Sequence, residues 1–314
     1  MERLPVSAVK EKLVSARAIT IVTHINPDAD TIGTGLGIYS LCKKHLSARV
    51  EIINTSNALP RHLDFLPFYG KIKRKRDFEE GLVIACDGGS IDRFGVDISG
   101  CEIINIDHHH SNEMYGTVNV VIPQYASASQ VAYALFKEIW DIDRESATCF
   151  YTALLSDTRY FTTASVDHEV FRVAAEMAAL GVSPSEAAFH LTQRRSLASL
   201  RILERALHSL QLYLEGRVAV LTITIEDIRA TGATMPDMDG IVDYAKSLAV
   251  VEVAVLMIEC EEGAQRVSLR SKGVDVSKTA ALFGGGGHKL AAGFIVKEAQ
   301  TQEIVDTILE EITL

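Results

Sequence analysis

The sequence lacks the features that mark membrane-spanning, secreted and thiolate-bound metal proteins. None of its apolar runs approaches the roughly 20 residues that cross a bilayer. The N-terminal segment carries charges where a secretory signal needs an uninterrupted apolar stretch. Its five cysteines are scattered and form no CxxC pair, which disfavours structural zinc and disulfides. These absences predict a cytoplasmic protein with free thiols and no membrane partner.

Basic charge is also scarce. The 314 residues include 31 Lys and Arg against 41 Asp and Glu, a formal net charge of −10. Long duplex nucleic acid needs a basic face on its protein, so this balance argues against such a partner. A small anionic substrate is still permitted, because bound divalent metals reverse the local field. The densest basic run, KIKRKR at 71–76, is either a solvated loop or a collar that attracts oligonucleotide phosphates.

The first half of the chain does contain a regular alternation of strand-like and helix-like segments. The strand-like apolar runs are residues 18–23, 49–54, 82–87 and 102–107. This alternation predicts an α/β fold with a doubly wound, mainly parallel sheet. Residues 183–216 have a largely helical pattern, and β-rich segments follow them. We therefore expect a catalytic domain over 1–183, a helical connector over 184–215 and a smaller α+β domain over 216–314.

Carboxylates and histidines gather where these strands end. They occur in THINPDAD, ACDGG, IDHHH and the later SDTRY, and the candidate metal ligands are His24, Asp28, Asp30, Asp87, His108 and Asp157. Open α/β sheets bind their ligands at the carboxyl ends of the strands. Carboxylates mixed with imidazoles suit Mn²⁺ best, with Mg²⁺ or Co²⁺ as alternatives. Two such ions can activate a shared water for attack on a phosphoryl group, so the sequence predicts a two-metal phosphoester hydrolase.

Each motif also has an ordinary structural explanation. The Asn-Pro-Asp turn can cap a helix, as can Asp30 or Thr31, and three consecutive histidines can form an exposed loop. The coincidence of four acidic or histidine-rich motifs, three of them at strand ends, favours the metal interpretation. The sequence contains no GxSxG elbow, no HExxH and no P-loop lysine, which leaves little support for rival chemistries.

These motifs resemble those of a known family. THINPDAD, the strand ending at Asp87, the Asp107-His108-His109 triplet and Asp157 are similar to the successive motifs of the DHH phosphoesterases. The C-terminal RVSLRSKGVDVSKTAALFGGGGHKLAAGF resembles the DHHA1 domain. The resemblance covers almost the whole chain. A short chain with these two domains is most similar to the NrnA-type members, which degrade nanoRNA and dephosphorylate 3′-phosphoadenosine-5′-phosphate (pAp).

The resemblance implies two metal positions that share one carboxylate. The first metal would be held by His24, Asp28 and Asp87. The second would be held by Asp30, Asp87, His108 and Asp157.

Two catalytic roles are implied for neighbours of these ligands. Asp107 would orient a neighbouring histidine, and His109 would face the substrate phosphate, where it stabilises negative charge or protonates the leaving oxygen. The extra His110 is interpreted as a loop residue. Arg159 stands where relatives usually have Gly, and it either contacts phosphate or fills the surface.

A glycine run and an arginine supply candidate substrate-binding residues: Arg270, Gly285, Gly286, Gly287 and His288. Glycines let backbone N–H groups approach an anion closely, although the run alone is equally consistent with a flexible turn. An arginine can hold a terminal phosphate through two parallel hydrogen bonds. The DHHA1 resemblance favours the substrate-binding interpretation of both.

Several functions remain open at this level. The leading one is hydrolysis of short single-stranded RNA and of pAp, and the alternative is hydrolysis of cyclic di-AMP or of its linear product pApA. A manganese inorganic pyrophosphatase ranks lower because its second domain lacks the GGGGH run. A processive RecJ-like nuclease would need a longer chain, and a nucleotide sensor without turnover would have lost a metal ligand. The resemblance also implies a possible homodimer.

Overall fold

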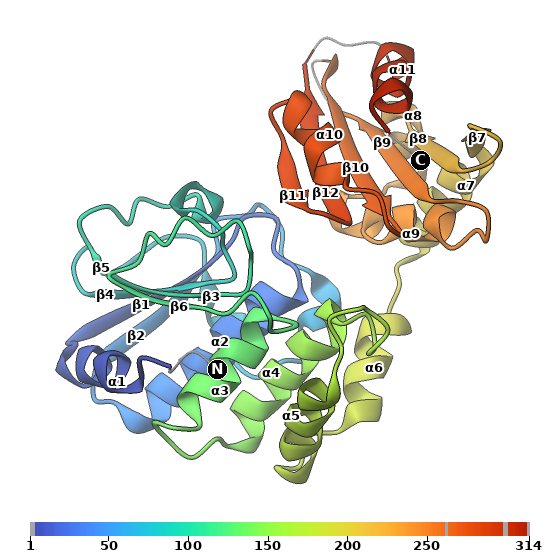
Figure 1. The fold of residues 1–314 in the computed structure, drawn as a ribbon. Coiled ribbons are helices and arrows are strands. Elements are labelled where there is room, and N and C mark those ends of the chain that lie inside the picture. The colour runs from blue at the N-terminus through green and yellow to red at the C-terminus, as the bar shows by residue number, and fades with distance from the viewer. Residues whose placement is uncertain (1–3, 261–262, 298–300, 313–314) are drawn as a thin grey trace. The chain divides into compact units, whose positions relative to one another are not determined.

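The computed structural model describes residues 4–260, 263–297 and 301–312. The chain folds as two compact units, unit 1 over Met1–Arg194 and unit 2 over Arg195–Leu314 (Figure 1). The predicted domain boundaries at 183 and 216, with a helical connector over 184–215, stay a prediction. The outer ends of the predicted domains, residues 1–3 and 313–314, lie outside the described residues.

Unit 1 is built on a parallel sheet with the strand order β3-β2-β1-β4-β5-β6. The strands are β1 Ala18–Thr23, β2 Arg49–Ile53, β3 Ile72–Lys73, β4 Leu82–Cys86, β5 Glu102–Asp107 and β6 Val118–Val121. β1 and β4 are buried along their whole length, as their continuous apolar sequences require for strands covered on both faces. The order reverses between β1 and β4, and this switch point is where such sheets bind ligands.

Six α-helices in the described part of unit 1 pack into one hydrophobic core with the sheet. They are α1 Val6–Ser15, α2 Ala29–His45, α3 Ala128–Phe136, α4 Arg144–Asp157, α5 His168–Ala179 and α6 Pro184–Thr192. α2 and α4 pack closely because Gly33 and Gly37 leave room for the other helix: a Cβ on Gly33 would lie 2.6 Å from the Cys149 carbonyl oxygen, and one on Gly37 would overlap the Phe150 ring. The antiparallel packing of these helices sets the end of α4 beside the start of α2.

Unit 2 contains a mixed sheet with the order β11-β12-β10-β9-β8-β7. Its strands are β7 Gln211–Tyr213, β8 Val218–Ile223, β9 Val253–Glu259, β10 Gln265–Ser271, β11 Gly286–His288 and β12 Ala291–Val296. Its helices are α7 Leu197–His208, α8 Ile225–Thr231, α9 Ile241–Lys246, α10 Val276–Leu282 and α11 Thr301–Glu311. The α/β class, a doubly wound parallel sheet followed by a smaller α+β region, is confirmed. No helix in the described ranges is both long and apolar enough to traverse a bilayer.

The basic run at 71–76 is tied to a buried acid. Lys73 forms ion pairs with Glu51, at 3.5 Å, and with Asp77. Glu51 is 2% exposed and also accepts hydrogen bonds from Thr20 and from the backbone N–H groups of Asp77 and Phe78. Part of this run therefore anchors the loop to the edge of the sheet, and the phosphate-attracting collar stays a prediction.

Candidate metal centre

The predicted ligands of unit 1 meet at one edge of its sheet. His24 follows β1, Asp87 follows β4 and His108 follows β5, so the shared direction of these parallel strands brings all three to the same edge. Helix termini supply the others, with Asp28 and Asp30 at the start of α2 and Asp157 at the end of α4. Three groups have ligand atoms that all lie within 4.8 Å of one another: His24–Asp28–Asp87, Asp30–His108–Asp157 and Asp87–His108–His109.

The first group is arranged around the imidazole of His24. Its Nε2 lies 3.7 Å from Asp28 Oδ1 and 3.5 Å from Asp87 Oδ2. Its Nδ1 lies 2.9 Å from the Ile25 carbonyl oxygen, an acceptor that favours the proton on Nδ1 and directs the Nε2 lone pair at the carboxylates. Asp28 is also the N-cap of α2, accepting from the Asp30 and Thr31 backbone N–H groups. Asp28 therefore both caps α2 and belongs to the cluster of candidate metal ligands.

The second group surrounds His108. Its Nε2 lies 3.9 Å from Asp30 Oδ2, 3.7 Å from Asp87 Oδ1 and 3.6 Å from Asp157 Oδ2. Its Nδ1 lies 3.2 Å from the Tyr125 carbonyl oxygen. The nitrogen-to-carboxylate distances exceed the roughly 3.2 Å limit of a good hydrogen bond, so the donor atoms enclose a space rather than bond directly to one another.

Asp30 is held by contacts that the sequence does not reveal. Its Oδ2 accepts the backbone N–H of Ala128 at 2.7 Å, and its Oδ1 accepts that of Ser129 at 3.1 Å and the hydroxyl of Thr34 at 3.2 Å. Ala128 and Ser129 begin α3, nearly a hundred positions along the chain. Only Thr34 has a sequence signal, because a residue four positions later on a helix shares the face of Asp30.

Asp87 faces both groups. Its Oδ2 lies toward His24, whereas its Oδ1 lies 3.7 Å from His108 Nε2 and 3.6 Å from His109 Nδ1. The side chain is 4% exposed, and Oδ1 is buried with no hydrogen-bond partner among the described residues. A buried carboxylate oxygen without a donor is costly, and a cation removes that cost. The backbone φ of Asp87 is +60°, a left-handed conformation that Asp and Asn tolerate better than most residues.

The acids also disturb one another's ionisation. Burial, and then the charge of Asp87, raise the pKa of Asp30 to about 7. Burial together with the charges of Asp30 and Asp87 raises the pKa of Asp157 well above its ordinary value. Burial alone would lower the pKa of His24, but the adjoining Asp28 and Asp87 carboxylates raise it to about 10. Crowded, desolvated carboxylates around an unpartnered oxygen fit a divalent cation, whose charge favours their ionised forms.

Asp107 lies behind this cluster and orients His109. It is fully buried, and its Oδ1 lies 2.7 Å from His109 Nδ1 and accepts the backbone N–H of His108 at 2.7 Å. Burial would raise the pKa of Asp107, but the hydrogen bond and charge of His109 hold it below its ordinary value. The contact at Nδ1 leaves Nε2 of His109 directed away from Asp107. The adjacent His110 is exposed.

A strained turn follows Asp157. Arg159, Tyr160 and Phe161 have φ angles of +47°, +59° and +63°, so three consecutive residues with a Cβ adopt the left-handed conformation. Such a conformation costs roughly 1–2 kcal/mol per residue with a Cβ and is routine only for Gly. The family resemblance implies Gly at the position of Arg159, and the positive φ found there is one that Gly adopts without strain.

We expect Arg159→Gly to raise the free energy of unfolding by about 1 kcal/mol, because Gly adopts this φ without the Cβ clash. Urea unfolding of the metal-free protein measures the effect. Glu215→Gly is a matched control, because exposed Glu215 has a φ of +57° in a turn of unit 2. A loss of stability in the Arg159 variant alone would mean that contacts of the arginine side chain outweigh the backbone strain.

The predicted substrate residues belong to unit 2. Arg270 on β10 and His288 on β11 both pair with Ala291 of β12, which places their side chains in one row on one face of the sheet. Two strand spacings separate their backbones by about 10 Å, and Ala291 lies between them in the row.

The glycine run is part of this sheet rather than a free loop. Gly286–His288 forms β11, which pairs with β12. A Cβ on Gly285 would overlap the Gly293 carbonyl oxygen, and one on Gly287, whose φ is +142°, would lie 2.5 Å from the Ala291 carbonyl oxygen. Gly286 has open space at its Cβ position. Close strand pairing therefore explains Gly285 and Gly287 without a ligand, whereas Gly286 is left with room for one.

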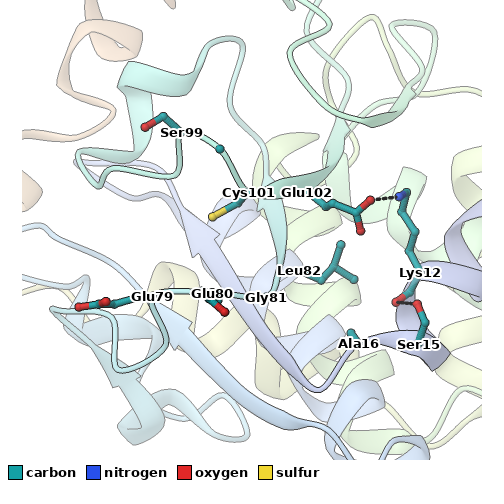
Figure 2. Close-up of a pocket in the computed structure, with 11 residues that line it drawn as sticks. Lys12, Ser15, Ala16, Glu79, Glu80, Gly81, Leu82, Ser99, Cys101 and Glu102 are labelled. Atoms are coloured by element: carbon teal, nitrogen blue, oxygen red, sulfur yellow. Dashed lines mark hydrogen bonds and ion pairs between the residues drawn. The ribbon is translucent and has the colours of Figure 1, made fainter.

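A separate hollow lies at the amino ends of β4 and β5. Figure 2 shows the residues that line it. It has a volume of about 420 Å³, and its lining includes Lys12, Ser15, Glu80, Cys101 and Glu102. Lys12 and Glu102 form an ion pair at 2.7 Å across one side of it. The candidate ligands His24, Asp87 and His108 follow the carboxyl ends of their strands, and none of the candidate ligands lines this hollow, so it does not belong to the candidate metal centre.

A parallel sheet with clustered acids and histidines at its switch point defines an α/β protein with a candidate metal centre. Residues 18–154 match the DHH family N-terminal domain, and residues 215–314 match the DHHA1 domain. This chain belongs to the DHH family, and the resemblance seen in its motifs is confirmed.

Three relatives illustrate this membership. The bifunctional oligoribonuclease and PAP phosphatase NrnA of Thermus thermophilus is 31% identical, over 94% of this chain and 89% of that protein. A probable manganese-dependent inorganic pyrophosphatase of Streptococcus thermophilus is 29% identical over 54% of this chain and 57% of its own length. The crystal structure of an exopolyphosphatase-related protein from Bacteroides fragilis has a TM-score of 0.89 at 25% identity, covering 99% of this chain and 96% of that one.

Proposed function

We propose that this chain is a two-metal phosphoesterase that hydrolyses short oligoribonucleotides to mononucleotides and pAp to AMP. One observation carries the proposal: Asp87 directs one carboxylate oxygen toward His24 and Asp28, and the other, unpartnered oxygen toward the histidines at the end of β5. A carboxylate placed in this way suits a bridge between two cations. The substrate class follows the activities for which the Thermus thermophilus relative is named.

The ligands divide into two sets under this proposal. His24, Asp28 and Asp87 hold one ion, and the other is held by Asp30, Asp87, His108 and Asp157. Oxygen-rich sets with one imidazole each suit Mn²⁺, with Mg²⁺ and Co²⁺ as alternatives. When bound, the ions supply an activated water and neutralise charge on the phosphoryl group.

The protein itself supplies orientation and proton chemistry. Asp107 holds His109 through Nδ1, so Nε2 is left to face the substrate phosphate. From there His109 stabilises negative charge or delivers a proton to the leaving oxygen. Asp107 stays ionised and keeps the ring in one orientation, which spares the reaction the cost of reorganising it.

Unit 2 binds substrate under the same proposal. Arg270 can take a phosphate through two parallel hydrogen bonds, and His288 lies in its row on the sheet. Gly285, Gly286 and Gly287 bring backbone close to that row, with Gly286 offering the open position. A homodimer, a cytoplasmic location and the lack of binding to long duplex nucleic acid stay predictions that accompany this proposal.

A parallel assay tests the function. The protein with Mn²⁺ is given pAp, a 5′-phosphorylated dinucleotide, a five-nucleotide RNA and cyclic di-AMP, with a chelator-treated sample as the control. We expect mononucleotides from the short RNAs and AMP from pAp, and no turnover after chelation. Rapid attack on cyclic di-AMP alone would favour the cyclic-dinucleotide alternative. If no substrate is turned over with Mn²⁺, Mg²⁺ or Co²⁺, the result would favour the alternative that this chain is a nucleotide sensor without catalytic activity.

A further inference from the structure

The side chain of Asn112 joins several backbone and side-chain groups beside the candidate metal centre. Its Nδ2 donates to Asp107 Oδ2 at 2.6 Å and to the Gly88 carbonyl oxygen at 3.2 Å. Its Oδ1 accepts the backbone N–H of Met114 at 2.8 Å and Nδ2 of Asn105 at 2.9 Å. A backbone N–H can only donate, so Met114 requires the amide oxygen on its side and thereby directs the amide NH₂ at Asp107.

This arrangement controls a buried carboxylate. Asp107 Oδ1 is occupied by His109 Nδ1 and by the backbone N–H of His108, whereas Oδ2 accepts from Asn112. Donors on both oxygens hold the plane of the carboxylate, and with it the oxygen that faces His109. If the Asn112 donor is lost, Oδ2 loses the hydrogen bond that it accepts from the described residues while staying buried, which favours rotation of the carboxylate away from His109.

The same amide reaches the turn that carries Asp87. The Gly88 carbonyl directly after Asp87 accepts from Asn112 and, at 2.8 Å, from the hydroxyl of Tyr115. Asn112 thus links the turn after β4 to the carboxylate behind His109. Asp87 precedes Gly88, and His109 is bonded to Asp107, so Asn112 supports both sides of a close pair: Asp87 Oδ1 and His109 Nδ1 lie 3.6 Å apart.

We propose that Asn112 is a positioning residue for the hydrolysis, acting through Asp107 and Gly88 without touching substrate. It fixes the ring orientation and the Nδ1–H tautomer of His109, and it holds the turn that presents Asp87. The inference rests on the proposed function in one respect, namely that His109 faces the substrate phosphate.

The test replaces Asn112 with Asp, which keeps the shape and the acceptor for Met114 but puts an oxygen against Asp107. We expect kcat on pAp with Mn²⁺ to fall about 10–100-fold with KM unchanged, the usual cost of removing a group that orients a metal-site residue. Asn119→Asp is the matched control: Asn119 bonds to Asn105 and to the loop backbone in the same network but not to Asp107. Its kcat should stay at the wild-type value.

A spectroscopic readout separates orientation from activity. The imidazole Nδ1–H of His109, bonded to Asp107, should give a downfield proton resonance that is identified by its absence in His109→Ala. We expect this resonance to be lost or shifted in Asn112→Asp and in the uncharged Asn112→Ala, and kept in Asn119→Asp. If Asn112→Asp does not fold, the Ala variant carries the comparison.

Two results would overturn the inference. The first is a folded Asn112 variant with wild-type kcat and an unchanged His109 resonance. The second is an equal loss of kcat in Asn119→Asp, which would reduce the network to a support for the loop. A wild-type protein without turnover would instead count against the proposed function, and the resonance comparison would still decide whether Asn112 orients His109.

Discussion

Asp87→Asn is expected to abolish hydrolysis of every phosphoester substrate, with kcat on pAp falling at least about 1000-fold. A bridging carboxylate contributes to both ions, and metal-ion stabilisation of several kcal/mol is lost with it, at 1.36 kcal/mol for each factor of ten. Asn preserves the size of the side chain and tolerates the φ of +60° at this position, so the backbone is not the cause of the loss. Steady-state kinetics with saturating Mn²⁺ measures the effect.

The metal-free stability of the same variant gives the complementary result. The charge of Asp87 repels Asp30 and Asp157 but attracts His24, so its removal has opposing effects on the metal-free protein. We expect the free energy of unfolding of the metal-free variant to stay close to that of the wild type. In the wild type, Mn²⁺ at 100 times its dissociation constant adds about 2.7 kcal/mol per site to the free energy of unfolding, and the variant should lose most of this gain.

Asp141→Asn is a matched control for this experiment, because exposed Asp141 undergoes the same change of charge far from the cluster. It should keep both turnover and the stabilisation by Mn²⁺. Near-wild-type turnover by Asp87→Asn would contradict the two-metal assignment, whatever the behaviour of the control.

Arg270→Ala is expected to raise KM for a 5′-phosphorylated dinucleotide about 10–100-fold while changing kcat much less. Hydrogen bonds to a charged group are worth roughly 1.5–3 kcal/mol, which corresponds to this range at 1.36 kcal/mol per factor of ten. The proposed metal ligands lie in unit 1 and Arg270 in unit 2, so we expect the substitution to leave the metal chemistry itself intact.

Two further variants sharpen this prediction. Arg270→Lys keeps the charge without the planar pair of donors and should give an intermediate KM. Arg266→Ala removes an arginine from the same strand and the same face but from a different row, opposite Ile295 rather than Ala291. We expect its KM to stay near the wild-type value. An unchanged KM in Arg270→Ala would remove Arg270 from substrate binding.

The sequence predicts the sheet of unit 1 well because burial on both faces demands continuous apolar strands. β1, β4 and β5 follow their Ile- and Val-rich runs to within a residue. The expectation that His24, Asp87 and His108 meet also needs only topology, since the carboxyl ends of adjacent parallel strands lie at one edge. The structure places these side chains together as a parallel sheet requires.

Other parts of the site depend on packing between distant segments. Asp157 is at a helix end, and its approach to Asp30 depends on how closely α2 and α4 pack over Gly33 and Gly37. The glycine run suggests a loop, yet its pairing with β12 makes it a strand. Strand partners and helix contacts across long sequence separations leave no local pattern to detect.

The sequence by itself determined the family, the kinds of candidate ligand and the strand ends that carry three of them, because residue type and local period are properties of neighbouring positions. Only the tertiary structure decided the direction of each donor atom. The two oxygens of Asp87 face different histidines, and the amide of Asn112 turns its NH₂ to Asp107. These directions follow from hydrogen bonds and buried contacts between elements far apart in the chain, which exist only once the fold has formed.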